Sequence, residues 1–415
     1  MQLKDGTVQL GIRSNLSQFI MLVILTAFVG GMIGMERSLL PRLAEREFHI
    51  ASKTAMFSFI MAFGITKAIT NYFTGTLSNK FGRHRLLIAG FMVALPIPWI
   101  LMYAENWNWI ICANILLGLN QGLAWSSTLV MKIDLVGEKG RGVAVGLNEF
   151  AGYLAVGLVT FLVAYLASVY GLRPYPFFTG VVFSVIGLVI SIFFIKDTRS
   201  HMEAASEVHT RNKVLKNIFW GTSFYDRNLS SVSQAGLTNN LNDGMIWGLY
   251  PLLLSLKGFS ISEIGAITAI YPAVWGIGQL FTGKISNHVS RKMLLVVGMA
   301  LQAIILLILS QAITFSHFII LSIILGISKA IVYPTFAIAI ADNTHPQQRA
   351  ESIGVFRFWR DGGYAVGAFL AGVLSDSFGI TTAIICIGCL TMISSLIVQL
   401  RMKNYSYKLD ETQCY

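Results

Sequence analysis

The stretch Gly75-Thr76-Leu77-Ser78-Asn79-Lys80-Phe81-Gly82-Arg83-His84-Arg85 lies between two long apolar runs. It is too polar to cross a bilayer, so we interpret it as a tight basic turn between two membrane-spanning helices. A second copy starts 208 residues later and runs from Gly283 to Lys292. The two copies align without a gap at four positions, which pair Gly75, Ser78, Asn79 and Arg83 with Gly283, Ser286, Asn287 and Arg291. A membrane chain whose halves repeat in this way is typical of a secondary transporter.

The composition is that of an α-helical membrane protein. Of the 415 residues, 54% are hydrophobic and only 12% are charged, whereas soluble proteins carry about 25% charged residues. The apolar residues come in runs of roughly 20, the length that spans about 30 Å of hydrocarbon as a helix. We expect an all-α membrane fold of twelve transmembrane helices, at about 16–43, 53–78, 86–104, 108–131, 142–168, 174–195, 230–256, 261–283, 293–312, 316–340, 350–374 and 379–400.

The repeat predicts two pseudo-symmetric six-helix bundles. The expected units are an N-terminal bundle (1–195), a cytoplasmic linker (196–229), a C-terminal bundle (230–401) and a cytoplasmic tail (402–415). The same offset relates Gly171 to Gly379 and also two charged pairs, Asp134 with Asp342 and Arg141 with Arg349. Charged pairs in the register of the turn motif make chance a poor explanation.

The net charge of +11 is explained by topology. If the N-terminus is cytoplasmic, most Lys and Arg residues fall in cytoplasmic segments such as 79–85, 132–141 and 196–229. This asymmetry follows the positive-inside rule and requires no nucleic-acid partner. We therefore expect a multi-pass protein of the plasma (cell inner) membrane, surrounded by the lipid bilayer, with both termini cytoplasmic.

The turn motif resembles a signature of the major facilitator superfamily. The pattern G-x-L-S-[D/N]-x-x-G-R-x-[R/K] lies between the second and third expected helices, with a degenerate copy between the eighth and ninth. The resemblance covers essentially the whole chain and implies transport by alternating access. It also implies gating by the motif and by the next cytoplasmic loop, although this chain has Asn where the family usually has Asp. The gating residues carried over are Gly75, Asn79, Gly82, Arg83, Arg85, Asp134 and Arg141.

Two patterns of proton-coupled drug exporters are missing. Those exporters carry an Arg three residues before a Gln-Gly pair in the fourth helix, but here Gly118 precedes Gln121-Gly122. They also carry a Gly-Pro pair in the fifth helix, whereas Gly152 and Gly157 have no proline between them. Both absences argue against a typical drug–proton antiporter.

Ionisable residues deep in the expected helices are candidates for the transport site, because each costs about 2.5–3.5 kcal/mol or more to insert. Arg357 and Asp361 are four residues apart and can pair, which leaves Arg360 without a local partner. We therefore expect an anionic substrate to bind Lys67, Lys329 and Arg360, together with Arg37. The alternative is that each cation only neutralises a structural acid, of which the spans contain Glu36, Glu149, Asp243 and Asp361.

The same acids are candidates for proton coupling, because a carboxyl group in a low-dielectric cavity binds protons more tightly and a nearby cation opposes this. The candidates are Glu149, Asp243 and Asp361, and the first two are preferred because Asp361 is expected to pair with Arg357. Polar and aromatic side chains complete the expected binding site, namely Asn120, Gln121, Trp125, Tyr153 and Tyr333.

Several other functions are not supported by the sequence. There is no phosphate-cradling G-x-x-x-x-G-K-[S/T], and the seven His residues are scattered, so we predict no ATP-driven cycle, no cofactor, no metal site and no enzyme activity. The preferred hypothesis is a monomeric, proton-coupled transporter of a small organic anion, either a carboxylate, including siderophore-like polycarboxylates, or a phosphorylated compound. The alternatives are a proton-driven multidrug exporter and a receptor that kept the fold without transporting.

Overall fold

The computed structural model describes residues 9–204, 214–285 and 289–403. Most of the expected tail, the middle of the expected linker and residues 286–288 of the second turn motif lie outside these ranges. Every element in the described ranges is helical. The N-terminal half contains α1 (Leu16–Arg37), α2 (Leu40–Arg46), α3 (Lys53–Met56), α4 (Ser58–Phe81), α5 (Arg83–Ala94), α6 (Pro96–Tyr103), α7 (Trp107–Asn120), the π-helix η1 (Gln121–Trp125), α8 (Ser126–Tyr170), the 3-10 helix η2 (Tyr175–Phe177) and α9 (Phe178–Phe193).

Three short elements stand between the halves: α10 (Arg199–Ala204), α11 (Ile218–Trp220) and the π-helix η3 (Gly221–Tyr225). The C-terminal half contains α12 (Arg227–Leu256), α13 (Ile261–Ile285), α14 (Arg291–Leu309), α15 (Phe315–Asp342), α16 (Pro346–Phe378) and α17 (Ile380–Arg401). These helices provide the twelve expected crossings. The long helix α8 contributes to two of them, because it is interrupted at Gly137, whose φ of 70° is not helical.

Eight helices in the described part are long and apolar enough to cross a membrane by themselves. The other four crossings are α4, α7 with η1 and the start of α8, α12, and α16. They contain many of the polar side chains that the sequence analysis singled out, such as the Asn239–Asp243 cluster in α12 and the Arg357–Asp361 run in α16. Polar residues in a span normally face other helices or a cavity, so we expect these four helices to turn their polar sides toward the interior of the molecule.

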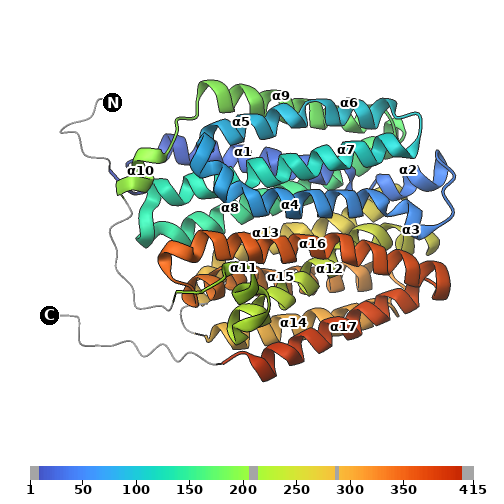
Figure 1. Ribbon diagram of the computed structural model, residues 1–415. Coiled ribbons are helices and arrows are strands. Elements are labelled where there is room, and N and C mark those ends of the chain that lie inside the picture. The colour runs from blue at the N-terminus through green and yellow to red at the C-terminus, as the bar shows by residue number, and fades with distance from the viewer. Residues whose placement is uncertain (1–8, 205–213, 286–288, 404–415) are drawn as a thin grey trace.

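The two halves lie side by side, with α4 packed along α16 and α8 along α13 (Figure 1). One end of the molecule carries α10, and we call it the linker end. The opposite end carries α2 and α3, and we call it the far end. The repeat is also visible in two turns. Gly171 lies between the fifth and sixth crossings and Gly379 between the eleventh and twelfth, and their φ values are 89° and 86°.

Two ion pairs at the linker end repeat the same register. Arg83 Nε lies 2.9 Å from Asp134 Oδ2, and Arg291 Nε lies 3.3 Å from Asp342 Oδ2. Arg83 of the turn motif thus pairs with Asp134 of the next loop. Burial raises the pKa of Asp134 to about 6, although Arg83 and a hydrogen bond from Thr198 oppose the rise.

The remaining residues of the expected gate occupy different environments, and one of their side chains lies outside the described part of the chain. Gly82 has a φ of 85° and separates α4 from α5, so it supplies the sharp turn. Arg85 is exposed, and Arg141 is half-buried in α8. Gly75 and Asn79 belong to α4, but the Asn79 side chain lies outside the described part. The gating role of all these residues stays a prediction.

One carboxylate joins the two halves at the far end. Asp376, in the last turn of α16, accepts hydrogen bonds from the backbone N–H groups of Lys53 (2.6 Å) and Thr54 (2.9 Å) at the start of α3. The hydroxyls of Ser52 (2.7 Å) and Thr54 (2.8 Å) also donate to it. Partial burial favours the neutral acid, but these four bonds outweigh it and lower the pKa of Asp376 to about 2. Asp376 therefore caps a helix of the other half.

Candidate functional site: a charged cavity between the halves

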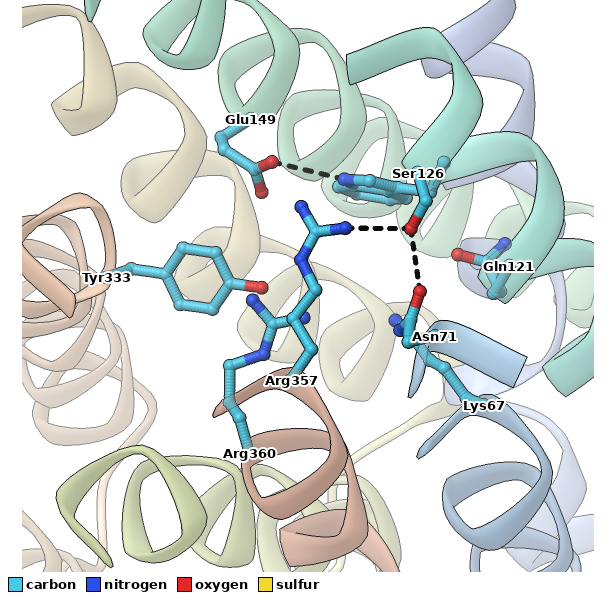
Figure 2. A pocket seen from close by; sticks show the side chains of 9 residues that line it. Lys67, Asn71, Gln121, Ser126, Glu149, Tyr333, Arg357 and Arg360 are labelled. Atoms are coloured by element: carbon cyan, nitrogen blue, oxygen red, sulfur yellow. Dashed lines mark hydrogen bonds between the residues drawn. The ribbon is translucent and has the colours of Figure 1, made fainter. Parts of the chain in front are cut away.

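A small cavity lies between the two halves (Figure 2). Its volume of about 10 Å³ is roughly that needed for one water molecule. Five helical segments of the described chain contribute polar groups to it, and one of them, η1, is a π-helix, a form that is frequent at functional sites. The lining residues are Lys67 and Asn71 of α4, Gln121 and Trp125 of η1, Ser126 and Glu149 of α8, Tyr333 of α15, and Arg357 and Arg360 of α16.

A chain of hydrogen bonds crosses the cavity from one half to the other. Arg357 donates to the Ser126 hydroxyl (2.9 Å), and Ser126 donates to the Asn71 side-chain oxygen (2.7 Å). The Asn71 amide then donates to Asp361 (2.5 Å). Since Arg357 and Asp361 belong to α16 while Ser126 and Asn71 belong to the N-terminal half, separating the halves must break this chain twice.

The expected pairing of Arg357 with Asp361 is wrong. Arg360 is the partner, and its Nε and one terminal nitrogen lie 2.8 and 2.9 Å from the two carboxylate oxygens. Asp361 is fully buried and also accepts a hydrogen bond from Asn240 (3.2 Å). These contacts draw the carboxylate toward α12 and α4, while Arg357 extends toward Ser126 instead. Spacing by four residues permitted a contact that the tertiary packing did not use.

Lys329 also has a counter-charge inside the protein. Its Nζ lies 2.9 Å from Asp243 Oδ1 and donates to the Asn239 carbonyl at 2.5 Å. The Tyr271 hydroxyl donates to the same carboxylate. Lys329 and Asp243 are 1% and 0% exposed, and neither lines the cavity. They form a buried ion pair within the C-terminal half, apart from the other candidate residues.

Two cations lining the cavity differ from these, because neither contacts a carboxylate. Among the described residues, no acid forms a salt bridge with Lys67 or Arg357. The Lys67 ammonium lies 5.3–5.5 Å from the ring centres of Phe63, Trp125 and Tyr364, within cation–π distance. Lys67 and Arg357 are therefore the cavity cations whose charge the protein leaves without direct neutralisation.

Arg37 lies nearer the far end, outside the cavity lining. Its guanidinium stacks 3.6 Å from the ring centre of Trp247, and a nitrogen lies 3.8 Å from Glu36. None of its three guanidinium nitrogens has a hydrogen-bond partner in the described part of the chain. Glu36 itself accepts a hydrogen bond from Asn114 (3.2 Å).

Glu149 presents one free oxygen at the cavity. Its Oε1 accepts hydrogen bonds from Trp125 Nε1 (3.1 Å) and from the Asn148 amide (2.8 Å). Its Oε2 has no partner among the described residues. Figure 2 shows the carboxylate on the same side of the cavity as the Arg357 guanidinium. Glu149 is thus the candidate acid that a solute or a proton in the cavity could reach.

The other expected binding residues divide between the cavity and the bundle interior. Gln121, Trp125 and Tyr333 line the cavity. Asn120 instead donates to the Gly90 carbonyl within the N-terminal half (2.9 Å), and Tyr153 lies behind Tyr333, whose hydroxyl accepts its hydrogen bond at 3.1 Å.

The comparison with family models decides the family. The model described as the Major Facilitator Superfamily matches residues 18–238 and 232–407. The chain belongs to this superfamily. It is therefore a multi-pass membrane transporter, and the resemblance seen in the turn motif is confirmed.

Similar proteins within the Major Facilitator Superfamily (MFS) are named for different kinds of substrate. The chain is 24% identical over 337 residues to the multidrug resistance protein MdtG of Salmonella arizonae and to that of Salmonella typhi, covering 79% of this chain and 80% of each relative. The crystal structure of the human organic anion transporter MFSD10 (TETRAN) matches with a TM-score of 0.71 at 14% identity, covering 93% of this chain and 99% of that one. The latter similarity supports the twelve-helix MFS fold.

Three cavity residues, Asn71, Ser126 and Arg357, were not among the predicted binding residues. Asn71 and Ser126 are uncharged, so neither was considered costly in a membrane. Arg357 was recognised as a deep cation but was expected to pair with Asp361, and it corresponds to Glu149 under the 208-residue offset. That correspondence was the available signal that Arg357 faces the cavity.

Proposed function

We propose that this MFS transporter carries a small organic anion by alternating access, coupled to protons. It acts as a monomer in the plasma membrane with both termini cytoplasmic. The substrate class is a carboxylate or a phosphorylated compound with an apolar or aromatic body. The two halves alternately expose the cavity, and the anion crosses while it is bound between them.

The observation that carries this proposal is the pair of cavity cations without a contacting carboxylate, Lys67 and Arg357. Lys67 is buried and Arg357 is partly buried, and a buried charge without a partner is costly, by several kcal/mol for a broken buried pair. An anion bound between Lys67 on α4 and Arg357 on α16 would neutralise both at once and would link the two halves. The planar fork of Arg357 suits the two oxygens of a carboxylate or phosphate.

The surroundings of Lys67 favour a substrate that is only partly polar. Three aromatic rings surround the ammonium, and Tyr333 lies on the opposite side of the cavity. Ligand sites usually measure about 300–1,000 Å³, so the cavity of about 10 Å³ has to enlarge before an organic anion can enter. We therefore interpret the present conformation as closed around the site.

Coupling to protons is assigned to Glu149. Its free oxygen faces the cavity, whereas Asp243 and Asp361 are both held by internal cations. A carboxylate whose surroundings change as the halves move can bind a proton on one side of the membrane and release it on the other.

The test is a thermal-shift screen of aliphatic and aromatic carboxylates and phosphates on the purified protein. Binding of an anion only to the folded state raises the unfolding temperature, by an amount that grows with the logarithm of the ratio of anion concentration to Kd. We expect Lys67→Gln and Arg357→Gln to abolish the shift, while Lys257→Gln, which changes an exposed Lys at the far end, retains it. If no anion stabilises the protein, or if both cavity variants respond as the parent does, the anion assignment is wrong.

A second candidate function is export of cationic or neutral drugs. The free oxygen of Glu149 would receive a cationic group, and relatives named multidrug resistance protein are 24% identical to this chain over 337 residues. Under this alternative Glu149→Gln abolishes binding of cationic compounds, and Lys67→Gln leaves it intact. Assaying both variants against both ligand classes distinguishes the two functions.

A further inference from the structure

Lys132 is a buried cation that the proposed function does not yet use. Lys132 belongs to the basic segment 132–141, which was expected to be cytoplasmic, yet its side chain is fully buried at the start of α8. Its ammonium donates to the Leu22 carbonyl (3.1 Å) and to the Thr26 hydroxyl (2.6 Å). Among the described residues no carboxylate forms a salt bridge with it. A buried ammonium without a contacting acid requires a more distant counter-charge.

A network of polar side chains connects Lys132 to the cavity. The Thr26 hydroxyl lies 3.2 Å from the Asn148 side-chain oxygen and 3.0 Å from the Thr128 hydroxyl. The Asn148 amide donates to Glu149 Oε1 at 2.8 Å. The N–H groups of Lys132 and Asn148 thus both point along the network toward Glu149, the direction that stabilises a carboxylate. The network links an ammonium at one end to a carboxylate at the other.

The members of this network all belong to the N-terminal half. Thr26 lies on α1, and Lys132, Asn148 and Glu149 lie on α8. They keep their mutual distances when the two halves move as rigid bodies. Lys132 is therefore a cation at a fixed distance from Glu149.

Arg357 is the contrasting cation, because it belongs to the C-terminal half and corresponds to Glu149 in the sequence repeat. Among the described residues, the ionisable groups that interact electrostatically with Glu149 include Lys67 of α4, Lys132 and Tyr153 of α8, Tyr333 of α15 and Arg357 of α16. Arg357 and Tyr333 move away from Glu149 when the halves separate, whereas Lys132 does not.

We propose that Lys132 is a positioning residue that, through Thr26 and Asn148, sets how tightly Glu149 binds its proton. Lys132 supplies a constant preference for the carboxylate, and Arg357 adds a second preference only while the cavity is closed. Glu149 then binds a proton more tightly while the halves are open than while they are closed. This inference rests on the proposed function, in which Glu149 is the proton site.

The experiment is a pH titration of the purified protein in nanodiscs, followed by infrared difference spectroscopy of the protonated carboxyl band. Glu149→Gln identifies the band that belongs to Glu149. We expect Lys132→Met to move the midpoint of this band about one pH unit upward, the lower end of what a neighbouring charge produces. Met keeps the length of the side chain without its charge.

Two further variants separate this role from simple packing. Thr26→Val removes the hydroxyl at constant shape and moves the midpoint in the same direction by a smaller amount. Thr26→Ser keeps the hydroxyl, removes a methyl group, and titrates as the parent does. A purely structural role of Thr26 would instead make the two variants alike.

The proposal is overturned if Glu149 titrates at the same pH in the parent, Lys132→Met and Thr26→Val. Should Lys132→Met fail to fold, Thr26→Val against Thr26→Ser decides the question. The titration contains no substrate, so it does not depend on the anion assignment. Shifted midpoints without any stabilising anion would contradict the proposed substrate class alone, and stabilising anions with unshifted midpoints would contradict the role of Lys132 alone.

Discussion

Removing the carboxylate of Asp376 should loosen the far end of the molecule. Its four hydrogen bonds to Ser52, Lys53 and Thr54 cap α3 from the opposite half. Replacing an N-terminal capping residue with Ala costs about 0.5–2 kcal/mol, and Asp376 is largely solvent-exposed, so we take about 1.4 kcal/mol. This corresponds to a tenfold change in the equilibrium between the closed and the open far end.

Hydrogen exchange measured by mass spectrometry tests this magnitude. The amides of Lys53 and Thr54 donate directly to Asp376, so Asp376→Ala should increase their exchange about tenfold. Hydrogen bonding lowers the pKa of Asp376 to about 2, so the carboxylate stays ionised at every pH well above 2. The stabilisation by the cap is lost as the pH falls from the ordinary pKa of Asp toward 2. The difference between parent and variant should therefore be constant between about pH 5 and pH 8.

Glu263→Ala is the matched control. Glu263 is also an exposed acid at the start of a helix at the far end, where it accepts hydrogen bonds from Ser260 N (2.8 Å) and Oγ (2.7 Å). All of these contacts lie within the C-terminal half. Its removal should leave exchange at Lys53 and Thr54 unchanged. Exchange in Asp376→Ala within threefold of the parent would refute the role of Asp376 in holding the far end closed.

Two further predictions concern other charged groups. Because burial raises the pKa of Asp134 to about 6, the folded protein binds an extra proton below that pH and gains about 1 kcal/mol of stability between pH 7 and pH 5. Thermal unfolding of Asp134→Asn should lack this gain, and equal pH slopes for parent and variant would contradict it. Asp243→Asn should cost about 3–5 kcal/mol, because it leaves Lys329 buried without its counter-charge. Adding Lys329→Met should recover much of that loss, and equal unfolding midpoints for the single and double variants would refute this explanation.

The fold was predictable because hydrophobic length and repeat register are local properties of the chain. The expected twelfth helix, 379–400, differs by one residue at each end from α17. The 208-residue offset aligned Arg83 with Arg291 and Asp134 with Asp342, and these residues form corresponding ion pairs in the two halves. The four spans with many polar residues were also predicted, because recognisable polar turns bound them in the sequence.

The partners of the buried charges were less predictable. Asp243 neutralises Lys329 across 86 residues of sequence, and the choice of Arg360 over Arg357 by Asp361 depends on contacts from α4 and α12. Lys132 was assigned to a loop because it follows an apolar run, although it is buried. Charge counting identified deep ionisable residues, but only tertiary packing decides which of them remain without a partner.

The balance of charge around the cavity has a consequence for the rate of net transport. Lys67, Arg357 and Arg360 face two acids, Glu149 and the Asp361 that contacts Arg360, so one positive charge is in excess when the site is empty. On the proposed mechanism, a carrier loaded with a monovalent anion crosses the closed conformation electrically balanced, whereas an empty carrier has to enclose an uncompensated charge. The unloaded return is then the slow half of the cycle, and one-for-one exchange of anions outruns net movement in either direction.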